Sequence, residues 1–343
     1  MTQQLEISEF IEQSEHIPVI DVRTPAEFAH AHIPGAINIP IFTNEERAQV
    51  GKSYKKQGKD KAVILGLELV GSKLAGFVKQ AKKIAVNNKL LVHCWRGGMR
   101  SASMAWLFDT AGIQTTTLNG GYKSYRRHIK DSFAKNYKLI VLGGMTGSGK
   151  TEILKAMAEQ GEQFIDLEKL AHHKGSAFGS LGQLEQYSTE QFENNLYEDW
   201  KKLDEGRIVW LEDESQAIGS VRLPEELYIR IRKSPVLKVN LPKSERINWL
   251  VKDYGSFDKE KLKSAVLRIQ KRLGGLRAKE AIQSIEMNDF HKVADITLEY
   301  YDKAYNYGLK MREENSVFDI DLNKIMPDEN AKKIIAHYPL LSI

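Results

Sequence analysis

This chain of 343 residues has a single cysteine, Cys94, and no long apolar run. One cysteine excludes an internal disulfide and any zinc site built from several thiolates, so we expect a reduced thiol in the cytoplasm. The first ten residues, MTQQLEISEF, have neither a basic region nor an apolar core. No apolar run approaches the roughly 18 residues of a membrane span. We therefore expect a cytoplasmic protein without a membrane segment.

The chain also has little net charge. It has 50 Lys and Arg residues and 45 Asp and Glu residues. A nucleic-acid partner must therefore be argued from local clusters of charge. The chain is long, and apolar residues make up 42% of it. Together these indicate two packed domains rather than a disordered chain.

Short apolar runs alternate with helical patterns twice along the sequence, as expected for parallel sheets covered by helices. Strands are predicted at 18–22, 37–39, 89–92, 114–118, 138–142, 164–166, 208–211 and 236–239. Helices are predicted at 25–30, 101–110 and 190–203, and the chain after Lys243 is predicted to be mostly helical. We expect an α/β protein with one domain at 1–128, a connector at 129–137 and a second domain at 138–343.

The segment GMTGSGKT follows a predicted strand, precedes a helical stretch and matches the phosphate-binding P-loop G-x-x-x-x-G-K-[ST] at every fixed position. Glycines let backbone N–H groups surround phosphate oxygens, and the lysine adds a positive charge. The predicted phosphate-binding residues are Gly144, Gly147, Ser148, Gly149, Lys150 and Thr151. Glu212 and Asp213, at the end of the strand 208–211, are candidates for binding Mg²⁺ or substrate. The motif leaves open whether the ligand is ATP or another diphosphate.

A second loop, HCWRGGMRS at residues 93–101, contains the cysteine. It lies between a predicted strand and a predicted helix, where loop N–H groups and nearby arginines lower the pKa of a thiol. The predicted catalytic residues are Cys94, Arg96 and Arg100. The spacing from Cys94 to Arg100 is also that of protein tyrosine phosphatase loops, so sulfur transfer and phosphoester hydrolysis both remain open.

Two further stretches, IDVRTPAEFAHAHIPGAINIP and LNGGY, resemble the rhodanese family over about residues 5–128, with an insertion at about 45–74 that compact rhodaneses lack. The loop cysteine of that family carries a persulfide. Five stretches in order, CWRGGMRS, GGMTGSGKT, HHKGSAFGSLG, WLEDESQAIG and RLGGLR, resemble the tRNA 2-selenouridine synthase family over essentially the whole chain. The second domain is then a P-loop domain with a helical C-terminal part.

The resemblance implies a transferase that replaces sulfur by selenium in the wobble 2-thiouridine of tRNA. It implies selenophosphate as the selenium donor and geranyl diphosphate as the reagent that first alkylates the sulfur. Both are substrates, so no tightly bound cofactor is expected, although Mg²⁺ is a candidate at the P-loop. The spacing of His30 and His32 at a predicted helix end favours turn packing, so no structural metal is expected. The implied partners are the anticodon region of tRNA and the enzyme that supplies selenophosphate.

One basic segment without Asp or Glu suits an RNA backbone. The predicted RNA-binding residues are Lys261, Lys263, Arg268, Lys271, Arg272, Arg277 and Lys279. A solvated helix face is the alternative interpretation. Trp95 or Tyr122 is a candidate for stacking on the displaced base.

Two other functions compete with tRNA modification. One is a sulfurtransferase or a Cys-x5-Arg phosphatase fused to an ATP-dependent kinase-like domain, although a small substrate would not require the basic segment. The other is a non-catalytic RNA-binding protein, which two intact loops argue against.

Overall fold

The computed structural model describes residues 3–255 and 257–340, which divide into two compact units. The N-terminal unit extends to Ser132 and includes Glu193–Tyr197; the C-terminal unit contains Phe133–Phe192 and the chain from Glu198 onward. Within the described ranges, no helix combines the length and apolar character needed to cross a membrane. Each unit contains a five-stranded parallel sheet, which confirms the predicted α/β class.

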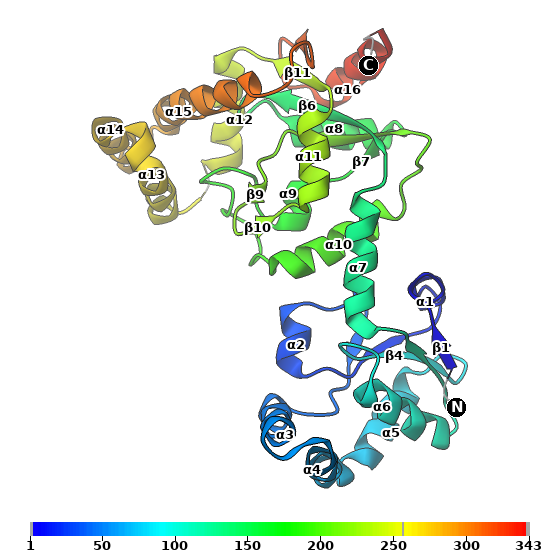
Figure 1. The fold of residues 1–343 in the computed structure, drawn as a ribbon. Helices are drawn as coiled ribbons and strands as arrows, with labels where there is room; N and C mark the ends of the chain where they lie inside the picture. The colour runs from blue at the N-terminus through cyan, green and yellow to red at the C-terminus, as the bar shows by residue number, and fades with distance from the viewer. Residues whose placement is uncertain (1–2, 256, 341–343) are drawn as a thin grey trace. The chain divides into compact units, whose positions relative to one another are not determined.

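The N-terminal sheet has the strand order β1-β5-β4-β2-β3, with all neighbours parallel (Figure 1). Its strands are β1 (Gln3–Leu5), β2 (Val19–Asp21), β3 (Ile37–Asn38), β4 (Lys89–His93) and β5 (Gln114–Leu118). The central strand β4 is buried from Leu90 to its end, because its apolar side chains face helices on both sides of the sheet. Its carboxyl end therefore delivers Cys94 to the edge at which parallel sheets bind ligands.

Seven helices surround this sheet in the described part of the unit. They are α1 (Ile7–Ser14), α2 (Pro25–His30), α3 (Asn44–Gln57), α4 (Lys59–Gly71), α5 (Leu74–Ile84), α6 (Met99–Thr110) and α7 (Gly121–Phe133). Helices α2 and α3 begin with capping boxes, in which Thr24 pairs with Glu27 and Thr43 with Glu46. The insertion folds as α3 and α4, and Val70 of α4 belongs to the hydrophobic core. The insertion is thus part of the unit's packed structure.

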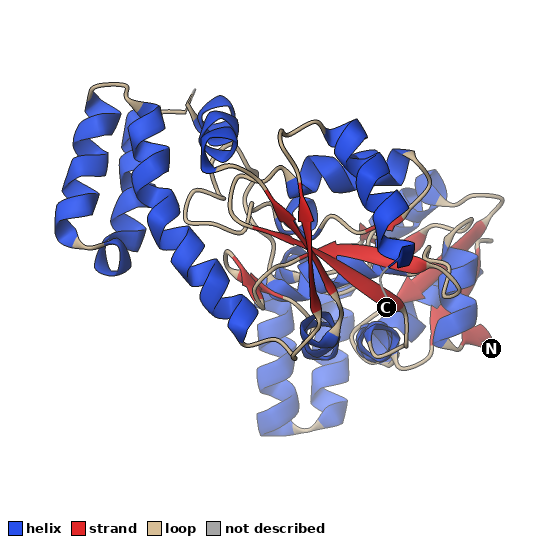
Figure 2. Ribbon diagram, turned by 90° about the horizontal axis from the view of Figure 1, so that it is seen from above, coloured by secondary structure: helices blue, strands red, loops and turns tan. Residues whose placement is uncertain are grey.

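The C-terminal sheet has the order β12-β11-β6-β8-β7 and is also parallel throughout, with helices around its strands (Figure 2). Its strands are β6 (Lys138–Gly144), β7 (Gln163–Phe164), β8 (Ile208–Glu212), β11 (Val236–Asn240) and β12 (Val317–Asp321), beside a small antiparallel pair of β9 (Ala217–Ile218) and β10 (Val221–Arg222). Strand β12 lies in the region predicted to be mostly helical. It forms because it pairs with β11, a contact that local sequence does not encode.

The helices of the C-terminal unit carry the residues that surround the P-loop. They are α8 (Lys150–Glu159), α9 (Leu167–Ala171), α10 (Thr189–Trp200), α11 (Glu225–Lys233), α12 (Lys243–Tyr254), α13 (Lys259–Leu273), α14 (Gly275–Glu286), α15 (Phe290–Lys310) and α16 (Pro327–His337), followed by a short 3₁₀ helix (Tyr338–Leu340). Helices α8 and α16 bury Met157 and Ile334 against the sheet. Helices α13, α14 and α15 form a separate apolar cluster around Val266, Ala281 and Ile296.

Candidate active sites: a cysteine loop and a phosphate-binding loop

Cys94 directly follows β4, and the next four residues lead into α6. The turn requires glycine at residue 97, because φ is 64° there and a Cβ atom would lie 2.7 Å from the carbonyl oxygen of Leu118. The backbone N–H of Tyr122 donates to the carbonyl oxygen of Cys94 at 2.8 Å. The turn after β5 therefore holds the cysteine loop in place.

The Cys94 thiol is 3% exposed, and its Sγ lies 3.2 Å from the hydroxyl oxygen of Ser101. Burial alone would raise the pKa of the thiol. Hydrogen bonds from the Ser101 hydroxyl and from the backbone of Arg96 and Ser101, together with the charge of Arg100, hold the pKa below its usual value of 9.0. Sequence reasoning did not single out Ser101, although its place in the first turn of α6 is a usable signal.

The two predicted arginines differ in their surroundings. Arg100 donates to the two carboxylate oxygens of Glu27 at 2.7 and 3.4 Å, and Glu27 is itself held by the capping box of α2. Arg96 is exposed and forms no ion pair with any described residue. Both line a cavity of about 620 Å³ that also contains the thiol. The complete lining is Glu27, Arg47, Cys94, Trp95, Arg96, Gly98, Met99 and Arg100.

A buried charged pair lies behind the cysteine loop. Arg23, 1% exposed, donates to both carboxylate oxygens of Asp21, at 3.0 Å from Nε to Oδ1 and 2.6 Å from Nη2 to Oδ2. Its guanidinium lies 3.9 Å from the centre of the Tyr122 ring. Burial would raise the pKa of Asp21, but His93 and Arg23 hold it below its usual value. Because Tyr122 is fully buried against Arg23, the prediction that Tyr122 stacks on an RNA base is wrong.

The P-loop lies at the carboxyl end of β6, and all six predicted phosphate-binding residues line one cavity of about 990 Å³. Gly147 and Gly149 have φ of 80° and 67°, a conformation that other residues rarely adopt. The ammonium group of Lys150 donates to the carbonyl oxygen of Gly144 at 3.2 Å. The loop therefore has the conformation in which backbone N–H groups can surround phosphate oxygens.

Two residues from distant helices hold the P-loop. Arg246 of α12 donates to the carbonyl oxygen of Thr146 at 3.1 Å and forms a buried ion pair with Asp302 at 2.8 Å. The hydroxyl of Tyr305, on α15, accepts from the N–H of Gly144 at 2.7 Å. Neither residue was predicted, because each is about 100 residues or more from the loop in sequence.

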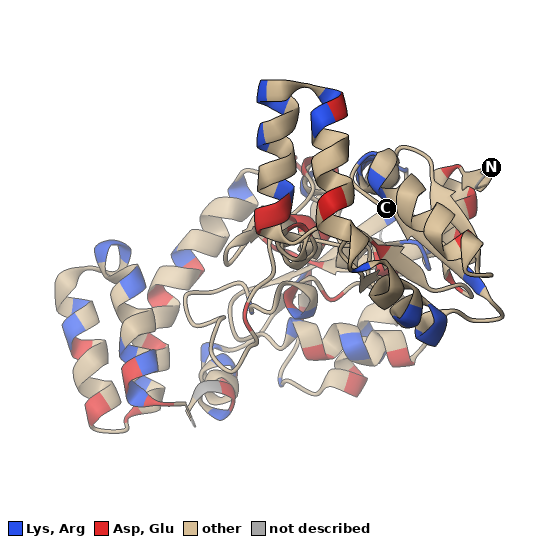
Figure 3. Ribbon diagram, turned by 90° about the horizontal axis from the view of Figure 1, so that it is seen from below, with Lys and Arg blue, Asp and Glu red and all other residues tan. Residues whose placement is uncertain are grey.

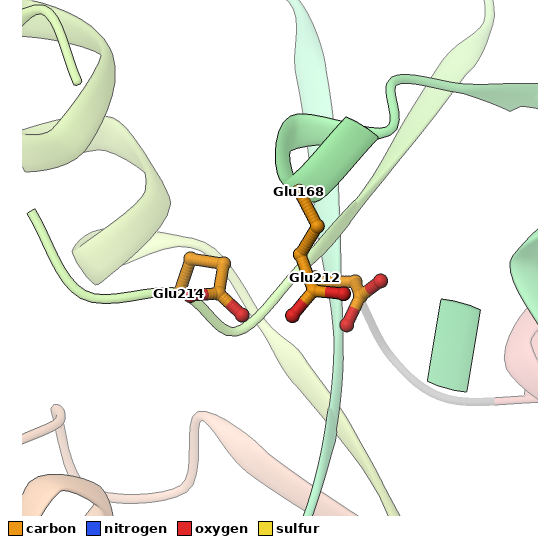
Figure 4. A group of neighbouring side chains, drawn as sticks. All are labelled: Glu168, Glu212 and Glu214. Carbon is orange, nitrogen blue, oxygen red and sulfur yellow. The ribbon is translucent and has the colours of Figure 1, made fainter. Parts of the chain in front are cut away.

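Three carboxylates, those of Glu168, Glu212 and Glu214, lie close together (Figure 4). One oxygen each from Glu168, Glu212 and Glu214 lies within 4.8 Å of the others, and the Thr151 hydroxyl is 3.3 Å from Glu168. Asp213, predicted together with Glu212, lines the same cavity but does not belong to this cluster. Its carboxylate accepts from the buried Arg312 at 2.5 Å. Successive side chains of a strand point to opposite faces, which separates Asp213 from the other carboxylates.

Burial and mutual repulsion raise the pKa of these carboxyl groups, to about 9 for Glu168 and about 8 for Glu214. Glu212 is 3% exposed, and its Oε1 has no hydrogen-bond partner among the described residues. A buried oxygen without a partner is costly, and a divalent cation would satisfy it. The oxygen donors present, carboxylates and a hydroxyl, are those that Mg²⁺ prefers.

A mostly apolar pocket of about 50 Å³ adjoins the P-loop cavity. The two share Thr146, Ser176, Leu250 and Tyr301. The other residues of the pocket are Phe178, Val251, Gly255, Leu262, Phe290, Val293, Ala294 and Thr297. One water needs about 10–15 Å³ of such space, so the pocket holds several heavy atoms. A ligand that combines phosphate with a hydrocarbon chain fits this pair of cavities.

The predicted RNA-binding residues lie on α13 and α14, helices along which basic and acidic residues are interspersed (left side of Figure 3). Lys263 pairs with Glu260 and Glu286, and Arg277 pairs with Glu299 at 2.8 Å. Arg268 bonds to the carbonyl oxygen of Ala177, and Arg272 to the hydroxyl of Tyr300. Lys261, Lys271 and Lys279 form no ion pair with a described residue. Acids from neighbouring segments therefore balance part of a charge that looks unopposed in the sequence.

A thiol of lowered pKa at the end of one parallel sheet and a P-loop at the end of another define a protein with a rhodanese-like domain and a P-loop domain. The family model for the rhodanese-like domain matches residues 4–128, and the model for the tRNA 2-selenouridine synthase AAA domain matches residues 137–333.

Relatives support the same assignment. The tRNA 2-selenouridine synthase of Bdellovibrio bacteriovorus is 35% identical, over 89% of this chain and 92% of the relative. Those of Nitrosomonas europaea and a Sulfurovum species are 33% and 36% identical, covering 92% and 88% of this chain and 95% and 91% of theirs. The chain belongs to the tRNA 2-selenouridine synthase family.

Proposed function

We propose that this protein replaces sulfur by selenium in a 2-thiouridine of tRNA, in two steps that use its two loops. Membership of the family and the names of relatives that match nearly the whole chain support the overall reaction. The division into two steps rests on one observation: an apolar pocket adjoins the P-loop cavity. That pairing suits a prenyl diphosphate better than a nucleotide.

The first step is transfer of a geranyl group from geranyl diphosphate to the sulfur of the base. The diphosphate binds the P-loop and Lys150, and the end of the hydrocarbon chain enters the apolar pocket. The allylic carbon–oxygen bond breaks, a carbon–sulfur bond forms, and the base loses the proton from N3. Lys150 stabilises the charge that develops on the leaving diphosphate.

Mg²⁺ fits beside this loop, where Thr151, Glu168, Glu212 and Glu214 would hold it. When bound, the ion supplies positive charge to the diphosphate. Its charge would also favour the ionised form of these carboxyl groups, whose pKa values are otherwise raised.

The second step uses the cavity of Cys94, where Arg96 and Arg100 attract the selenophosphate anion. The selenium of that donor is already at the level of selenide, so a sulfur–selenium bond on Cys94 would require an oxidant. Attack of the thiolate on phosphorus needs none: a sulfur–phosphorus bond forms, the phosphorus–selenium bond breaks, and hydrogen selenide leaves. Hydrogen selenide then displaces geranyl thiolate from C2 of the base, and water cleaves the sulfur–phosphorus bond.

The partners in this scheme are the anticodon region of tRNA and the enzyme that makes selenophosphate. Three lysines of α13 and α14 form no ion pair with a described residue and are the strongest candidates for contact with the RNA backbone: Lys261, Lys271 and Lys279.

The test is mass spectrometry of nucleosides from 2-thiouridine tRNA incubated with the protein, first with geranyl diphosphate and then with selenophosphate. We expect geranylated thiouridine and then selenouridine. Cys94→Ser should stop at the geranylated base, because a serine hydroxyl is not ionised at neutral pH. Lys150→Ala should slow geranyl transfer.

Loss of both steps in each variant would contradict the division between the two loops. An unchanged tRNA, accompanied by ATP hydrolysis or phosphoester cleavage, would favour the phosphatase or sulfurtransferase fused to a kinase-like domain.

A further inference from the structure

Arg47, in the first turn of α3, lines the cavity that contains the Cys94 thiol. This helix belongs to the insertion that distinguishes the domain from compact rhodaneses. No motif in the sequence connects Arg47 with the cysteine, which is 47 positions away. The insertion therefore adds a positive charge to the site that the cysteine loop does not provide.

The first turn of α3 is held at three points. Thr43 and Glu46 form its capping box, and the Asn44 side-chain oxygen accepts from the N–H of Ala26, on α2, at 3.0 Å. The carboxylate of Glu46 also pairs with Lys73 at 2.5 Å. These contacts use residues that directly precede position 47. The backbone of Arg47 is thus fixed while its side chain reaches the cavity.

The charges around the thiol do not balance. Arg100 is neutralised by Glu27, which the capping box of α2 holds in place. Arg47 and Arg96 form no ion pair or side-chain hydrogen bond with any residue that the structure describes. The cavity thus contains two uncompensated guanidinium groups beside one thiol of lowered pKa. A guanidinium donates in a planar fork that matches two oxygens of a phosphate group.

We propose that Arg47 and Arg96 bind a tetrahedral phosphorus oxyanion in front of Cys94. If the proposed function holds, this anion is the phosphoryl end of selenophosphate, so the inference rests on that function for the ligand's identity. The binding site itself does not depend on it. Arg47 thereby makes the insertion part of the donor site.

The single cysteine allows a direct test, since iodoacetamide alkylation reports on Cys94 alone. Inorganic phosphate should slow alkylation of the wild-type protein at constant ionic strength. In Arg47→Ala the phosphate concentration for half protection should rise about tenfold, the loss expected for one charge-assisted hydrogen-bonding group. Arg47→Lys should recover part of the protection. Lys55→Ala removes the same charge from an exposed position of α3 outside the cavity, so it should behave as wild type.

Equal protection of the wild-type and Arg47→Ala proteins would overturn the proposal, as would an equal effect of Lys55→Ala. The second measurement is the KM for selenophosphate in selenation of geranylated tRNA, which should rise about tenfold in Arg47→Ala while geranyl transfer is unchanged. If the wild-type protein shows the phosphate protection but no selenation, the proposed function fails and the anion site stands.

Discussion

The side chains at both loops have pKa values that follow from their immediate neighbours. At Cys94, donors from Ser101 and the loop backbone outweigh burial and lower the pKa. At Glu168, burial and two nearby carboxylates act in the same direction and raise it. As the pH rises, the Cys94 thiol therefore ionises earlier than an ordinary thiol, and the Glu168 carboxyl group ionises later than an ordinary carboxyl group.

Alkylation of Cys94 should proceed with a pH midpoint below that of an unperturbed thiol, whose pKa is 9.0. Ser101→Ala removes the first of the stabilising hydrogen bonds, so the midpoint should move upward. The rate of iodoacetamide alkylation between pH 5 and 10 measures both midpoints. An identical midpoint in the two proteins would show that Ser101 does not stabilise the thiolate.

Glu168→Gln should stabilise the protein in the absence of divalent cations. The folded-state pKa of Glu168, about 9, exceeds the usual 4.5, so its contribution to stability is present below pH 4.5 and is lost as pH rises toward 9. At pH 8 the variant should therefore have a higher Tm than the wild type, by a few degrees.

Added Mg²⁺ should raise the Tm of the wild type more than that of Glu168→Gln, because the variant has lost one anionic ligand. Glu159→Gln, an exposed change at the end of α8, serves as the control. A smaller Mg²⁺ effect on the wild type than on Glu168→Gln would contradict a cation site at these carboxylates.

At the scale of elements, the position of each loop depends on side chains from neighbouring strands and helices. At the carboxyl ends of β2 and β4, Asp21 pairs with Arg23 and lies 3.7 Å from the His93 ring. The P-loop is held by α12 and α15 through Arg246 and Tyr305. Helix α15 also supplies one wall of the apolar pocket. Each loop is therefore held by side chains that lie outside the loop itself.

Arg23→Ala should destabilise the N-terminal unit by about 3–5 kcal/mol, because it leaves the Asp21 carboxylate buried without its partner. Urea unfolding followed by tryptophan fluorescence measures the loss. The double change Asp21→Asn and Arg23→Ala removes the unpaired charge as well, and it should cost less than the single change. An Arg23→Ala protein as stable as the wild type would contradict this account.

Ala294→Leu should shift the first reaction toward shorter prenyl diphosphates, because the added carbons fill the small pocket. We expect geranyl transfer to fall at least tenfold while transfer from dimethylallyl diphosphate is retained. Overpacking costs typically 1–3 kcal/mol, so a Tm measurement must accompany the assay. Equal losses with both diphosphates in a folded variant would argue against a hydrocarbon chain in this pocket.

At the scale of the whole molecule, two units with separate cores serve one modification. In the proposed scheme the two steps act on one tRNA base, so a defect in one loop should be bypassed by supplying the product of that loop. Such a bypass is a property of the full chain, so it must be tested with the full chain.

Lys150→Ala protein should selenate tRNA that has already been geranylated, at a rate within a few-fold of wild type, because the damaged loop is no longer needed. Nucleoside mass spectrometry after addition of selenophosphate measures the product. Cys94→Ser protein given the same tRNA should yield no selenouridine. Failure of the Lys150→Ala protein would mean that the P-loop also takes part in the second step.

Most of the architecture and both loops could be predicted because their signals are local. Strands β4 and β5 were predicted within a residue or two, since buried parallel strands appear as short apolar or β-branched runs. Strand β12 was not predicted, because its pairing with β11 gives it a structure that its own residues do not specify. The catalytic and RNA-binding roles of the named residues stay predictions.

The amino-acid sequence by itself determined the two glycine-containing loops, the strands that lead into them and the family, because each rests on residues that are adjacent in the chain. Only the tertiary structure decided which distant side chains join them: Arg47 beside Cys94, Glu168 beside Thr151, and Arg246 and Tyr305 behind the P-loop. It also separated Asp213 from Glu212 and turned Tyr122 inward. The physical reason is that a side chain's partners are set by the packing of whole elements, whereas a motif records only its neighbours along the backbone.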